Sequence, residues 1–453
     1  MENKHRFISV TLLMVLLFAI FGVSIIQFHL PPFVPLVTAI MVTMIFGRLN
    51  HFSWNDLQNQ LLSGIQTGLA PIFLFLLIGM LIGLWMAVGV IPTLLWTGLN
   101  LANPTWFLPA AFLIPALIGT AIGSAFTTIA TVGVALMGVG LTLGFPAPVM
   151  AGAIISGAIF GDKSSPLSDS TNLAASIAGT DLFDHIKNLM WTTIPAFVVS
   201  LIAFTVLGLQ NHATASLASI TSLQNQLQPN FWSLLLLVLL FVMAWAKIPA
   251  IPTLMINVVL SSFIFLMNHS LTALSDTILN GFKTSADNPT IQALLNRGGM
   301  LSMMPTVIII MLALALGGML SQEKILQDFM APVIKRVKTQ AATVTGTIIT
   351  GILANFMIGE QYLATILPGQ LWKPVFKRVK LSPLALGRTL EDSGTVMNYL
   401  VPWGVAGSFA AQTLNVPVTS FALFAIFAWV SPIFSLISAW TGVGLKQLPD
   451  DIN

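Results

Sequence analysis

Apolar residues run along this chain in long blocks separated by short polar segments, and the blocks have the length of membrane-spanning helices. Ten blocks predict crossings, at about 7–28, 31–47, 69–88, 146–180, 188–208, 231–246, 249–267, 304–321, 383–410 and 418–440. A crossing takes roughly 20 apolar residues, and the period-two alternation of a membrane β-barrel is absent from the blocks. The pattern therefore predicts an all-α polytopic membrane protein with about ten transmembrane helices.

Two further apolar segments, about 106–144 and 340–372, do not fit as crossings. The second is flanked by two clusters of basic residues: Lys335, Arg336 and Lys338 before it, and Lys373, Lys377, Arg378 and Lys380 after it. Basic clusters mark the cytoplasmic side, and the 34 residues between these two are fewer than the roughly 40 that two crossings need. We therefore expect two re-entrant hairpins, because irregular backbone is tolerated at membrane depth only inside protein or along a cavity.

Charge is scarce, and most of the basic residues fall on one side of the predicted membrane. Only 7% of the 453 residues are charged, against about a quarter in soluble domains, which excludes a soluble enzyme, a disordered regulator and a nucleic-acid binder. With the N-terminus inside, fourteen of the 18 Lys and Arg are cytoplasmic, whereas Lys283 and Arg297 are outside, as is the polar loop 209–230. We expect a multi-pass protein of the cell (plasma) membrane with both termini in the cytoplasm.

The residue types that the chain lacks limit its chemistry. There is no cysteine, so disulfides, thiol catalysis and cysteine-bound metals are excluded. The six histidines have no metal-binding spacing. The apolar run after the basic N-terminus, residues 7–30, is longer than the roughly 7–15 residues of a cleaved signal, so we expect it to remain as the first helix.

Short motifs that contain proline, glycine or an acidic residue recur in the two halves of the chain in the same order. Pro32-x-x-Pro35 recurs as Pro249-x-x-Pro252, and Gly161-Asp162 corresponds to Glu391-Asp392 at an offset of 230. We predict a first repeat over 1–225, with a hairpin at about 106–144 and a broken helix at about 146–180. The second repeat, over 226–453, has a hairpin at about 340–372 and a broken helix at about 383–410. Because each repeat has five spans, the second is inverted, as is typical of secondary transporters.

Two polar islands interrupt the predicted broken helices at corresponding places. They are GDKSSPLSDSTN, residues 161–172, and RTLEDSGTVMN, residues 388–398. Ionisable groups inside a bilayer are costly and mark functional sites, and carbonyls freed at helix breaks suit Na⁺ together with hydroxyls and carboxylates. In the alternative interpretation the islands are solvated loops, with Lys163 paired to Asp162 or Asp169 and Arg388 paired to Glu391. We interpret the segment 181–187 as such a loop.

The tips of the predicted hairpins add further polar groups. The first tip, near 123–128, carries Thr127 and Thr128, and the second, near 355–361, carries Glu360 amid apolar residues. Glu360 is interpreted as a proton-binding carboxyl, with a carboxylate at the watery mouth of the hairpin as the alternative.

Four passages of the chain resemble the NhaC-type sodium/proton antiporter family, within the wider ion-transporter superfamily. They are GDKSSPLSDSTNLA (161–174), which is the most specific, GTAIGSAFTTIATVGVALMG (119–138), IGEQYLATILPG (358–369) and LEDSGTVMNYLVPW (390–403). The resemblance implies two re-entrant hairpins, paired broken helices, a transport domain that moves against a scaffold, and a homodimer. Met397-Asn398-Tyr399 and Gly404-Val405 depart from the smaller or more polar residues of the family, which leaves the substrate open.

The resemblance, carried over by position, implies a candidate site for ion and substrate. It comprises Asp162, Ser168, Asp169, Thr171, Asn172, Glu391, Asp392, Ser393 and Thr395, to which the hairpin tips add Thr127, Thr128 and Glu360. We expect Na⁺ at Asp169, Asn172 and Asp392, and the proton on Asp162, Glu360 or Asp392.

Two functions are compatible with this site. The first is secondary active transport in which Na⁺ leaves the cell in exchange for protons. The alternative is Na⁺- or H⁺-coupled antiport of small organic acids of the malate/lactate type or of amino acids, with Lys163 and Arg388 neutralising a carboxylate. A passive channel and an intramembrane protease are weaker alternatives. We expect no enzyme activity and no cofactor, because Na⁺ and H⁺ are the transported or coupling ions.

Overall fold

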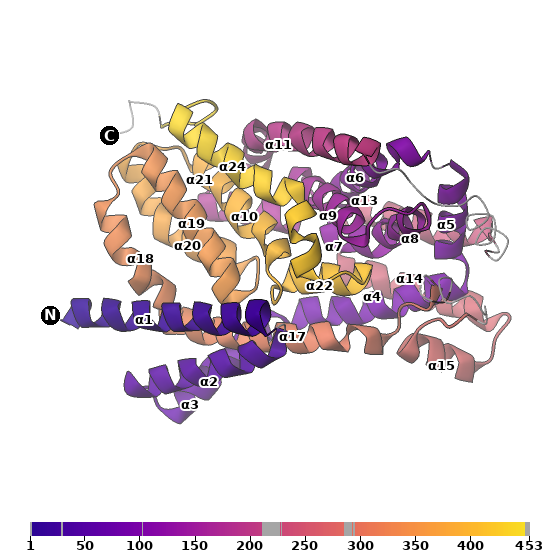
Figure 1. Ribbon diagram of the computed structural model, residues 1–453, viewed down its shortest axis with the longest axis horizontal. Helices are drawn as coiled ribbons and strands as arrows, with labels where there is room; N and C mark the ends of the chain where they lie inside the picture. Colours follow the sequence, from indigo (N-terminus) through magenta and orange to yellow (C-terminus); the bar gives the residue numbers. More distant parts are fainter. Residues whose placement is uncertain are drawn as a thin grey trace.

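The computed structural model describes residues 2–28, 30–101, 103–210, 227, 229–284, 292 and 295–448, and these are almost entirely helical. Within those ranges there is no β-strand, and Leu381 and Gln447 form an isolated bridge. Helix α1 begins and helix α24 ends at the same end of the molecule (Figure 1). The prediction of an all-α protein is confirmed.

The helices fall on either side of the segment around residue 220. Those before it are α1 (Glu2–Gly22), α2 (Phe33–Leu49), α3 (Trp54–Thr67), α4 (Leu69–Ala87), α5 (Val90–Leu101), α6 (Pro104–Ile122), α7 (Ala125–Thr128), α8 (Val134–Thr142), α9 (Ala147–Ser164), α10 (Asp169–Ala178) and α11 (Leu182–Gln210). Those after it are α13 (Leu234–Trp245), α14 (Ala250–Leu266), α15 (Leu271–Asn280), α17 (Met300–Gln322), α18 (Ile325–Arg336), α19 (Gln340–Ile358), α20 (Leu363–Arg378), α21 (Pro383–Leu390), α22 (Val405–Leu414), α23 (Val418–Phe421) and α24 (Ile426–Thr441). The long helices α1, α4, α11 and α17 run along the long axis of the molecule (Figure 1).

Several helices have the length and apolar character of membrane spans. In the described part of the chain seven helices meet both conditions, and the bent pair Val418–Phe424 and Ile426–Thr441 makes up to eight. Three shorter apolar helices, Phe33–Leu49, Phe231–Trp245 and Ala250–Leu266, coincide with the spans predicted at 31–47, 231–246 and 249–267. An integral membrane protein is therefore confirmed, and the total of about ten spans stays a prediction.

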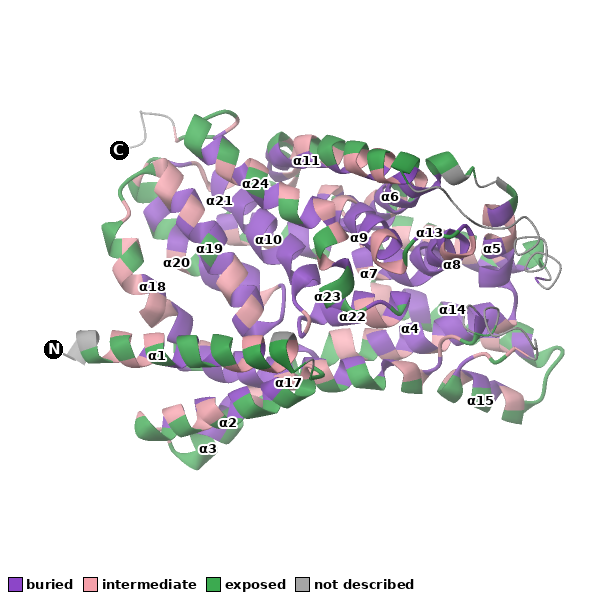
Figure 2. Ribbon diagram, viewed as in Figure 1, coloured by how far each residue is buried: buried purple, intermediate pink, exposed green. Residues whose placement is uncertain are grey.

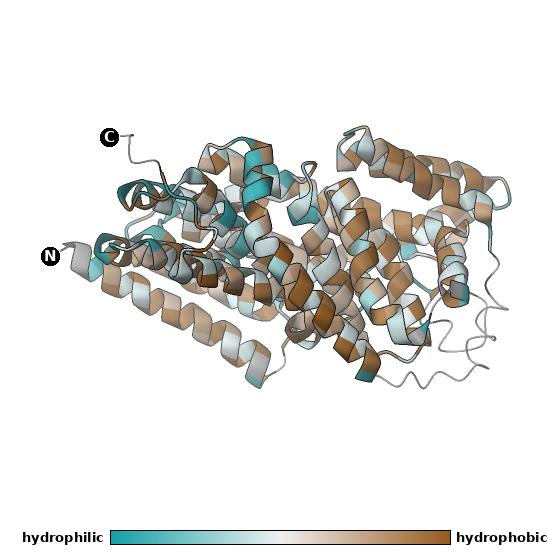
Figure 3. Cartoon of the chain, turned by 90° about the horizontal axis from the view of Figure 1, so that it is seen from above, coloured by the Kyte–Doolittle hydropathy of each residue, from teal (hydrophilic) through white to brown (hydrophobic). Residues whose placement is uncertain are grey.

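Apolar side chains fill the interior and also cover much of the outside. The buried residues concentrate in the middle of the molecule (Figure 2), in one cluster around α4, α6 and α9 and another around α1, α17 and α19. Large apolar side chains such as Leu12, Leu117 and Trp232 are exposed, which suits a lipid environment because soluble monomers rarely expose large apolar patches. Hydrophilic residues gather toward the end where α1 begins (Figure 3).

Helix α11 starts at Leu182, so the interpretation of 181–187 as a loop is wrong for its backbone. Asp181 stabilises this start because its carboxylate accepts hydrogen bonds from two backbone N–H groups, at 2.9 and 3.1 Å. His185 is fully buried on α11, whereas Asp184 remains exposed. The exposed acids are therefore solvated as predicted, and the histidine is not.

Each predicted hairpin and each predicted broken helix contains a helix break. The segment 106–144 holds α6, α7 and α8 with a break at Gly123, and 340–372 holds α19 and α20 with a break at Gly359. Both glycines have positive φ, 74° and 72°, which favours glycine. The segments 146–180 and 383–410 hold α9 with α10 and α21 with α22. These breaks supply most of the polar residues of the site.

The two predicted repeats share one interior. Their predicted boundary, between residues 225 and 226, lies outside the described residues. Helix α17 packs against α2, α3 and α4, and a Cβ on Gly64 of α3 would lie only 2.1 Å from the carbonyl oxygen of Leu314 on α17. Small residues allow such close packing between membrane helices, so the halves are interleaved rather than separate.

Candidate functional site

The break between α9 and α10 follows from the residues within it. Pro166 has no backbone N–H and cannot continue the hydrogen-bonding pattern of α9. Ser168 then caps α10, because its hydroxyl accepts a hydrogen bond from the N–H of Thr171 at 3.4 Å. The chain thus leaves one helix and starts another within four residues, 165–168.

Close packing of α9 against α6 fixes the position of Asp162. A Cβ added to Gly161 would lie 2.6 Å from the Cα of Gly119, so only glycine allows this approach. Asp162, the next residue, accepts a hydrogen bond from the hydroxyl of Ser170 at 3.4 Å. The end of α9, the start of α10 and the break after α6 therefore meet around Asp162.

The second broken helix is held by two asparagines. After α21 the chain makes a π-helical turn, Glu391–Thr395, and a 3₁₀ turn, Val396–Leu400. The side-chain amide of Asn355 on α19 donates to the carbonyl oxygens of Ser393 and Gly394, at 2.9 and 2.8 Å. Asn398 donates to the Asn355 side chain at 2.8 Å and accepts from the N–H of Ala406 at 2.8 Å. Side chains thus satisfy backbone groups that a continuous helix would have paired.

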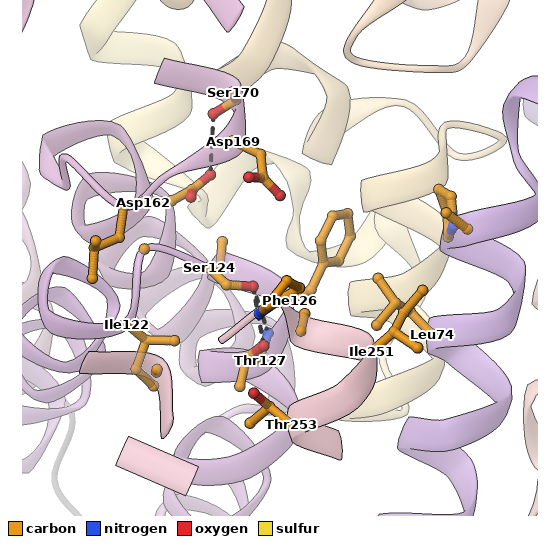
Figure 4. A pocket seen from close by; sticks show the side chains of 18 of the residues that line it. Leu74, Ile122, Ser124, Phe126, Thr127, Asp162, Asp169, Ser170, Ile251 and Thr253 are labelled. Carbon is orange, nitrogen blue, oxygen red and sulfur yellow. Dashed lines mark hydrogen bonds between the residues drawn. The ribbon is translucent and has the colours of Figure 1, made fainter. Parts of the chain in front are cut away.

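Three carboxyl side chains line one cavity of about 930 Å³: Asp162 and Asp169 from the α9–α10 break, and Glu360 from the α19–α20 break. Hydroxyl and amide groups join them in the lining, from Ser124, Thr127, Ser170, Asn172 and Gln361. Figure 4 shows Asp162 and Asp169 at one end of the cavity, and Leu74 and Ile251 away from them. The cavity combines acceptor oxygens at helix breaks with an apolar wall.

A second charged group, Lys163 with Asp392, is sealed inside the protein. Both side chains have no exposed surface and form an ion pair. Ser431 of α24 accepts a hydrogen bond from Lys163 at 2.8 Å and donates to Asp392 at 2.6 Å. Thr192 of α11 donates to the other oxygen of Asp392 at 3.0 Å. Both oxygens of Asp392 and the ammonium group of Lys163 have protein partners, as buried charges require.

Glu391 precedes Asp392 in the chain, but its carboxyl has different surroundings. Glu391 is fully buried, and its oxygens have no hydrogen-bond partner among the described residues. Lys163 and Asp162 are the charged groups close enough to act on it electrostatically. Glu391 therefore belongs neither to the cavity lining nor to the sealed pair.

The structure divides the predicted site residues into two sets. The cavity lining includes Thr127, Asp162, Asp169, Asn172 and Glu360. The remaining residues are buried and do not line it: Thr128, Ser168, Thr171, Glu391, Asp392, Ser393 and Thr395. Asp392 is thus not brought together with Asp169 and Asn172, the residues expected to hold Na⁺ with it. In the described part of the chain no group of three or more His, Asp or Glu has metal-binding geometry.

The ion pairs considered within the polar islands are wrong. Lys163 pairs with Asp392 rather than with Asp162 or Asp169, since consecutive helix residues do not face each other. Arg388 donates to the carbonyl oxygen of Gly444 and to the hydroxyl of Ser438, both at 2.8 Å, rather than to Glu391. Both cations therefore have fixed partners away from the cavity.

Several polar residues with a clear role were not predicted. Ser124 caps α7 by accepting from the N–H of Thr127 at 3.2 Å, and Gln361 lines the cavity beside Glu360. Thr192 and Ser431 bind the sealed pair. Ser124 and Gln361 lie within the predicted hairpin tips, 123–128 and 355–361, but were not singled out there. For Thr192 and Ser431 the signal is a single polar residue within an apolar helix, which is too common to identify such partners.

Comparisons with known proteins agree on one family. A model described as the Na⁺/H⁺ antiporter family matches residues 5–171 and 157–443. A "Na(+)/H(+) antiporter NhaC" of Alkalihalophilus pseudofirmus is 36% identical over 99% of this chain and 98% of its own, and one of Bacillus subtilis is 36% identical over 90% and 92%. A "Malate-2H(+)/Na(+)-lactate antiporter" of Bacillus subtilis is 32% identical over 96% and 93%.

Proposed function

The chain belongs to the Na⁺/H⁺ antiporter family, and on that premise we propose that it is a secondary active transporter that exports Na⁺ in exchange for protons. The observation that carries the proposal is the cavity lined by Asp162, Asp169 and Glu360 at two helix breaks. Carboxylates inside a membrane protein mark ion and proton pathways, and helix breaks supply further oxygen ligands.

Exchange follows when two cations compete for the same oxygens. Asp169 and Asn172 are the residues proposed to hold Na⁺, with hydroxyls of the break such as Ser170. Asp162 and Glu360 are the proposed proton carriers. Occupation by one cation excludes the other, so the inward gradient of protons drives Na⁺ outward. No resident cofactor is needed, because both ions are cargo.

Lys247, which is exposed, and Leu182 are among the residues that line the cavity, and the basic residues assign Lys247 to the cytoplasmic side. We therefore propose that this conformation faces inward, in the cell membrane, with both termini in the cytoplasm. A homodimer, which the family resemblance implies, is part of the proposal.

Two inverted repeats of five spans, each with a re-entrant hairpin, are the proposed architecture. Matched features support it: the breaks at Gly123 and Gly359 both have positive φ, and each lies next to a broken helix, α9–α10 in one case and α21–α22 in the other. Inverted repeats whose broken helices meet near the midplane are typical of secondary transporters.

For exchange of organic acids, the alternative, the cavity offers one basic residue against three acids. Lys163 and Arg388, which were expected to neutralise a carboxylate, are bound to Asp392 and to Gly444 with Ser438. The exposed Lys247 is the only basic residue in the lining. A carboxylate entering this cavity would meet three acids, so cation exchange is favoured.

Purified protein in proteoliposomes, loaded with a pH-sensitive dye, tests the proposal. An imposed Na⁺ gradient is expected to drive proton movement in the opposite direction, whereas K⁺ and choline gradients of equal size are not. Empty liposomes control for leakage. No pH change under the Na⁺ gradient would contradict Na⁺/H⁺ exchange, and a pH change that requires added malate or lactate would support the alternative.

A further inference from the structure

Exposed basic residues gather at the end of the molecule where α1 begins and α24 ends, beside α18 (Figure 1). Figure 3 shows the same end as its hydrophilic part. The residues come from the end of α18, the end of α20 and the segment after α24. All of them are exposed, and we call them the basic surface: Lys335, Arg336, Lys338, Lys377, Arg378, Lys380 and Lys446.

Hydrogen bonds hold the three segments of the basic surface together. The guanidinium group of Arg378 donates to the carbonyl oxygens of Ile334 and Val337, at 3.1 and 2.7 Å, and so joins the end of α20 to the end of α18. The N–H of Ser382 donates to the carbonyl oxygen of Lys446 at 3.0 Å, which adds the segment after α24. Membrane topology explains why each basic cluster is cytoplasmic, but it does not require clusters far apart in the sequence to meet.

The acids near the basic surface in sequence are either paired or buried. Asp328, on α18, forms an ion pair with Arg6. Three acids follow it in the described part of the chain, and all of them are buried: Glu360, Glu391 and Asp392. Like charges gathered on one surface repel one another, so an anionic partner would stabilise the arrangement.

Helix α18 presents apolar surface beside these charges. Its residues Ile325, Leu326 and Met330 are buried against the protein, whereas Val333, two positions before Lys335, is 43% exposed. A helix with apolar side chains and a basic end is typical of the membrane–water interface. A free phosphate ion would use only the charges of this surface, whereas a phospholipid would also cover the apolar part.

We propose that the basic surface binds the headgroups of anionic phospholipids in the cytoplasmic leaflet, with the acyl chains beside α18. A Lys or Arg near an anionic membrane surface contributes about fivefold in affinity. None of the seven residues lines the cavity of the proposed ion site. The inference therefore goes beyond the proposed function, and its tests need no transport.

Competition between two lipids tests the selectivity of the surface. The purified full chain in neutral detergent is given equal amounts of phosphatidylglycerol and phosphatidylcholine with the same acyl chains, and native mass spectrometry measures which lipid it retains. Both lipids carry a phosphate, but only phosphatidylglycerol has a net negative charge. We expect preferential retention of phosphatidylglycerol that weakens with added salt, and equal retention of the two lipids would overturn the inference.

Paired substitutions test the position of the lipid. The double variant Lys335→Gln with Lys377→Gln removes one charge from α18 and one from α20, and phosphatidylglycerol binding should weaken about 30-fold. The matched control, Lys187→Gln with Lys283→Gln, removes two exposed charges outside the basic surface and should bind as the unmodified protein does. Equal binding by the two double variants would contradict this placement, and an unchanged unfolding midpoint in both shows that folding is not the cause.

Probes without acyl chains test whether the partner is a lipid or a free anion. Dihexanoyl-phosphatidylglycerol is expected to displace the bound phosphatidylglycerol at a concentration at least about tenfold lower than glycerol 3-phosphate or inorganic phosphate, because only the lipid buries apolar surface. Displacement by all three probes at one concentration would assign the surface to a free phosphate and overturn the lipid assignment.

Discussion

The protein holds its membrane-embedded charges in two clusters that differ in what surrounds them. Asp162, Asp169 and Glu360 line a cavity, whereas Lys163 and Asp392 form an ion pair without exposed surface. Asp162 and Lys163 are consecutive on α9, but consecutive residues of a helix are rotated by about 100°. One helix therefore serves both clusters, and the phase of the helix decides which charge faces the cavity and which meets a protein partner.

Hydrogen bonding separates the two clusters further. Asp392 accepts bonds from Lys163, Ser431 and Thr192. Asp162 accepts a long one from Ser170, at 3.4 Å. An acid with three close partners has little to offer a passing cation, whereas the serine hydroxyls near Asp162 leave lone pairs of its carboxylate free. We therefore expect the sealed pair to contribute to stability and the cavity to bind the ion.

The largest effect is expected from breaking the sealed pair. Lys163→Met leaves Asp392 buried without a counter-charge, which costs about 3–5 kcal/mol in free energy of unfolding. Titration with a denaturing detergent in mixed micelles measures this. A change below about 1 kcal/mol would contradict the structural role.

Removing both charges is the control for that substitution. The double variant Lys163→Met with Asp392→Leu replaces the pair by apolar side chains and should recover most of the lost stability, because a buried ion pair is often no more stable than apolar residues of similar volume. If the double variant were as unstable as Lys163→Met, loss of packing rather than the orphaned charge would be the cause.

The cavity should respond in the opposite way, with loss of transport and little loss of stability. Asp169 is exposed in the structure, so Asp169→Asn removes a charge without leaving a buried one. We expect Na⁺-dependent proton exchange to fall by roughly 100-fold, equal to about 2.8 kcal/mol, at an unchanged unfolding midpoint. Asp184→Asn, at an exposed acid on α11, is the matched control. Undiminished exchange in Asp169→Asn would remove Asp169 from the mechanism.

The sequence predicted which segments carry the buried charges better than it predicted which charged side chains contact each other. Scarcity of charge and the polar islands identified both broken helices, and the helices α9–α10 and α21–α22 occupy the predicted segments. The pairing of Lys163 with Asp392 spans 229 residues and depends on how α9 and the π-helical turn Glu391–Thr395 both pack against α24. No local pattern encodes that packing, so the predicted neighbours of Lys163 were the nearest acids in the chain.

Helix ends were predictable only where a residue forces them. Pro166 and the glycines at 123 and 359 mark breaks that the structure has. The early start of α11 was missed because Asp181 was interpreted as solvated charge rather than as a helix cap. The bonds of Asn355 to the carbonyls of Ser393 and Gly394 were missed because they join segments that are far apart in the sequence.

Glu323 lies at the end of α17, outside the membrane-spanning segments. It differs from both clusters because its carboxyl is buried and has no ion-pair partner among the described residues. Its oxygens are buried and have no hydrogen-bond partner among the described residues, and a Cβ on Gly47 would lie 2.6 Å from one of them. Burial raises the pKa of Glu323 to about 7, from 4.5, and the charge of Arg6 opposes that shift.

This raised pKa predicts the sign of a pH effect. The folded protein binds the proton of Glu323 more tightly than the unfolded chain, so stability falls as pH rises from about 4.5 to about 7 and stays lower above that. Glu323→Gln should remove part of this decline, on the order of 1–2 kcal/mol, seen as a flatter unfolding midpoint between pH 5 and 8. An identical slope in the two proteins would contradict the assignment to Glu323.

The smallest effect is expected from the other ion pair of the described chain, Arg6 with Asp328, which is the exposed counterpart of the sealed pair. The Arg6 Nε donates to Asp328 at 2.6 Å, and the two side chains are 37% and 33% exposed. Water screens such a pair, so its coupling energy should be at most about 1 kcal/mol. A double-mutant cycle of Arg6→Ala and Asp328→Asn isolates it, since Arg6 also donates to the carbonyl oxygen of Glu323 at 2.7 Å.

A second cycle, with Lys163→Met and Asp392→Leu, should give a coupling several times larger. Equal couplings would mean that burial does not distinguish the pairs, and the contrast between the sealed pair and the open cavity would then need another cause.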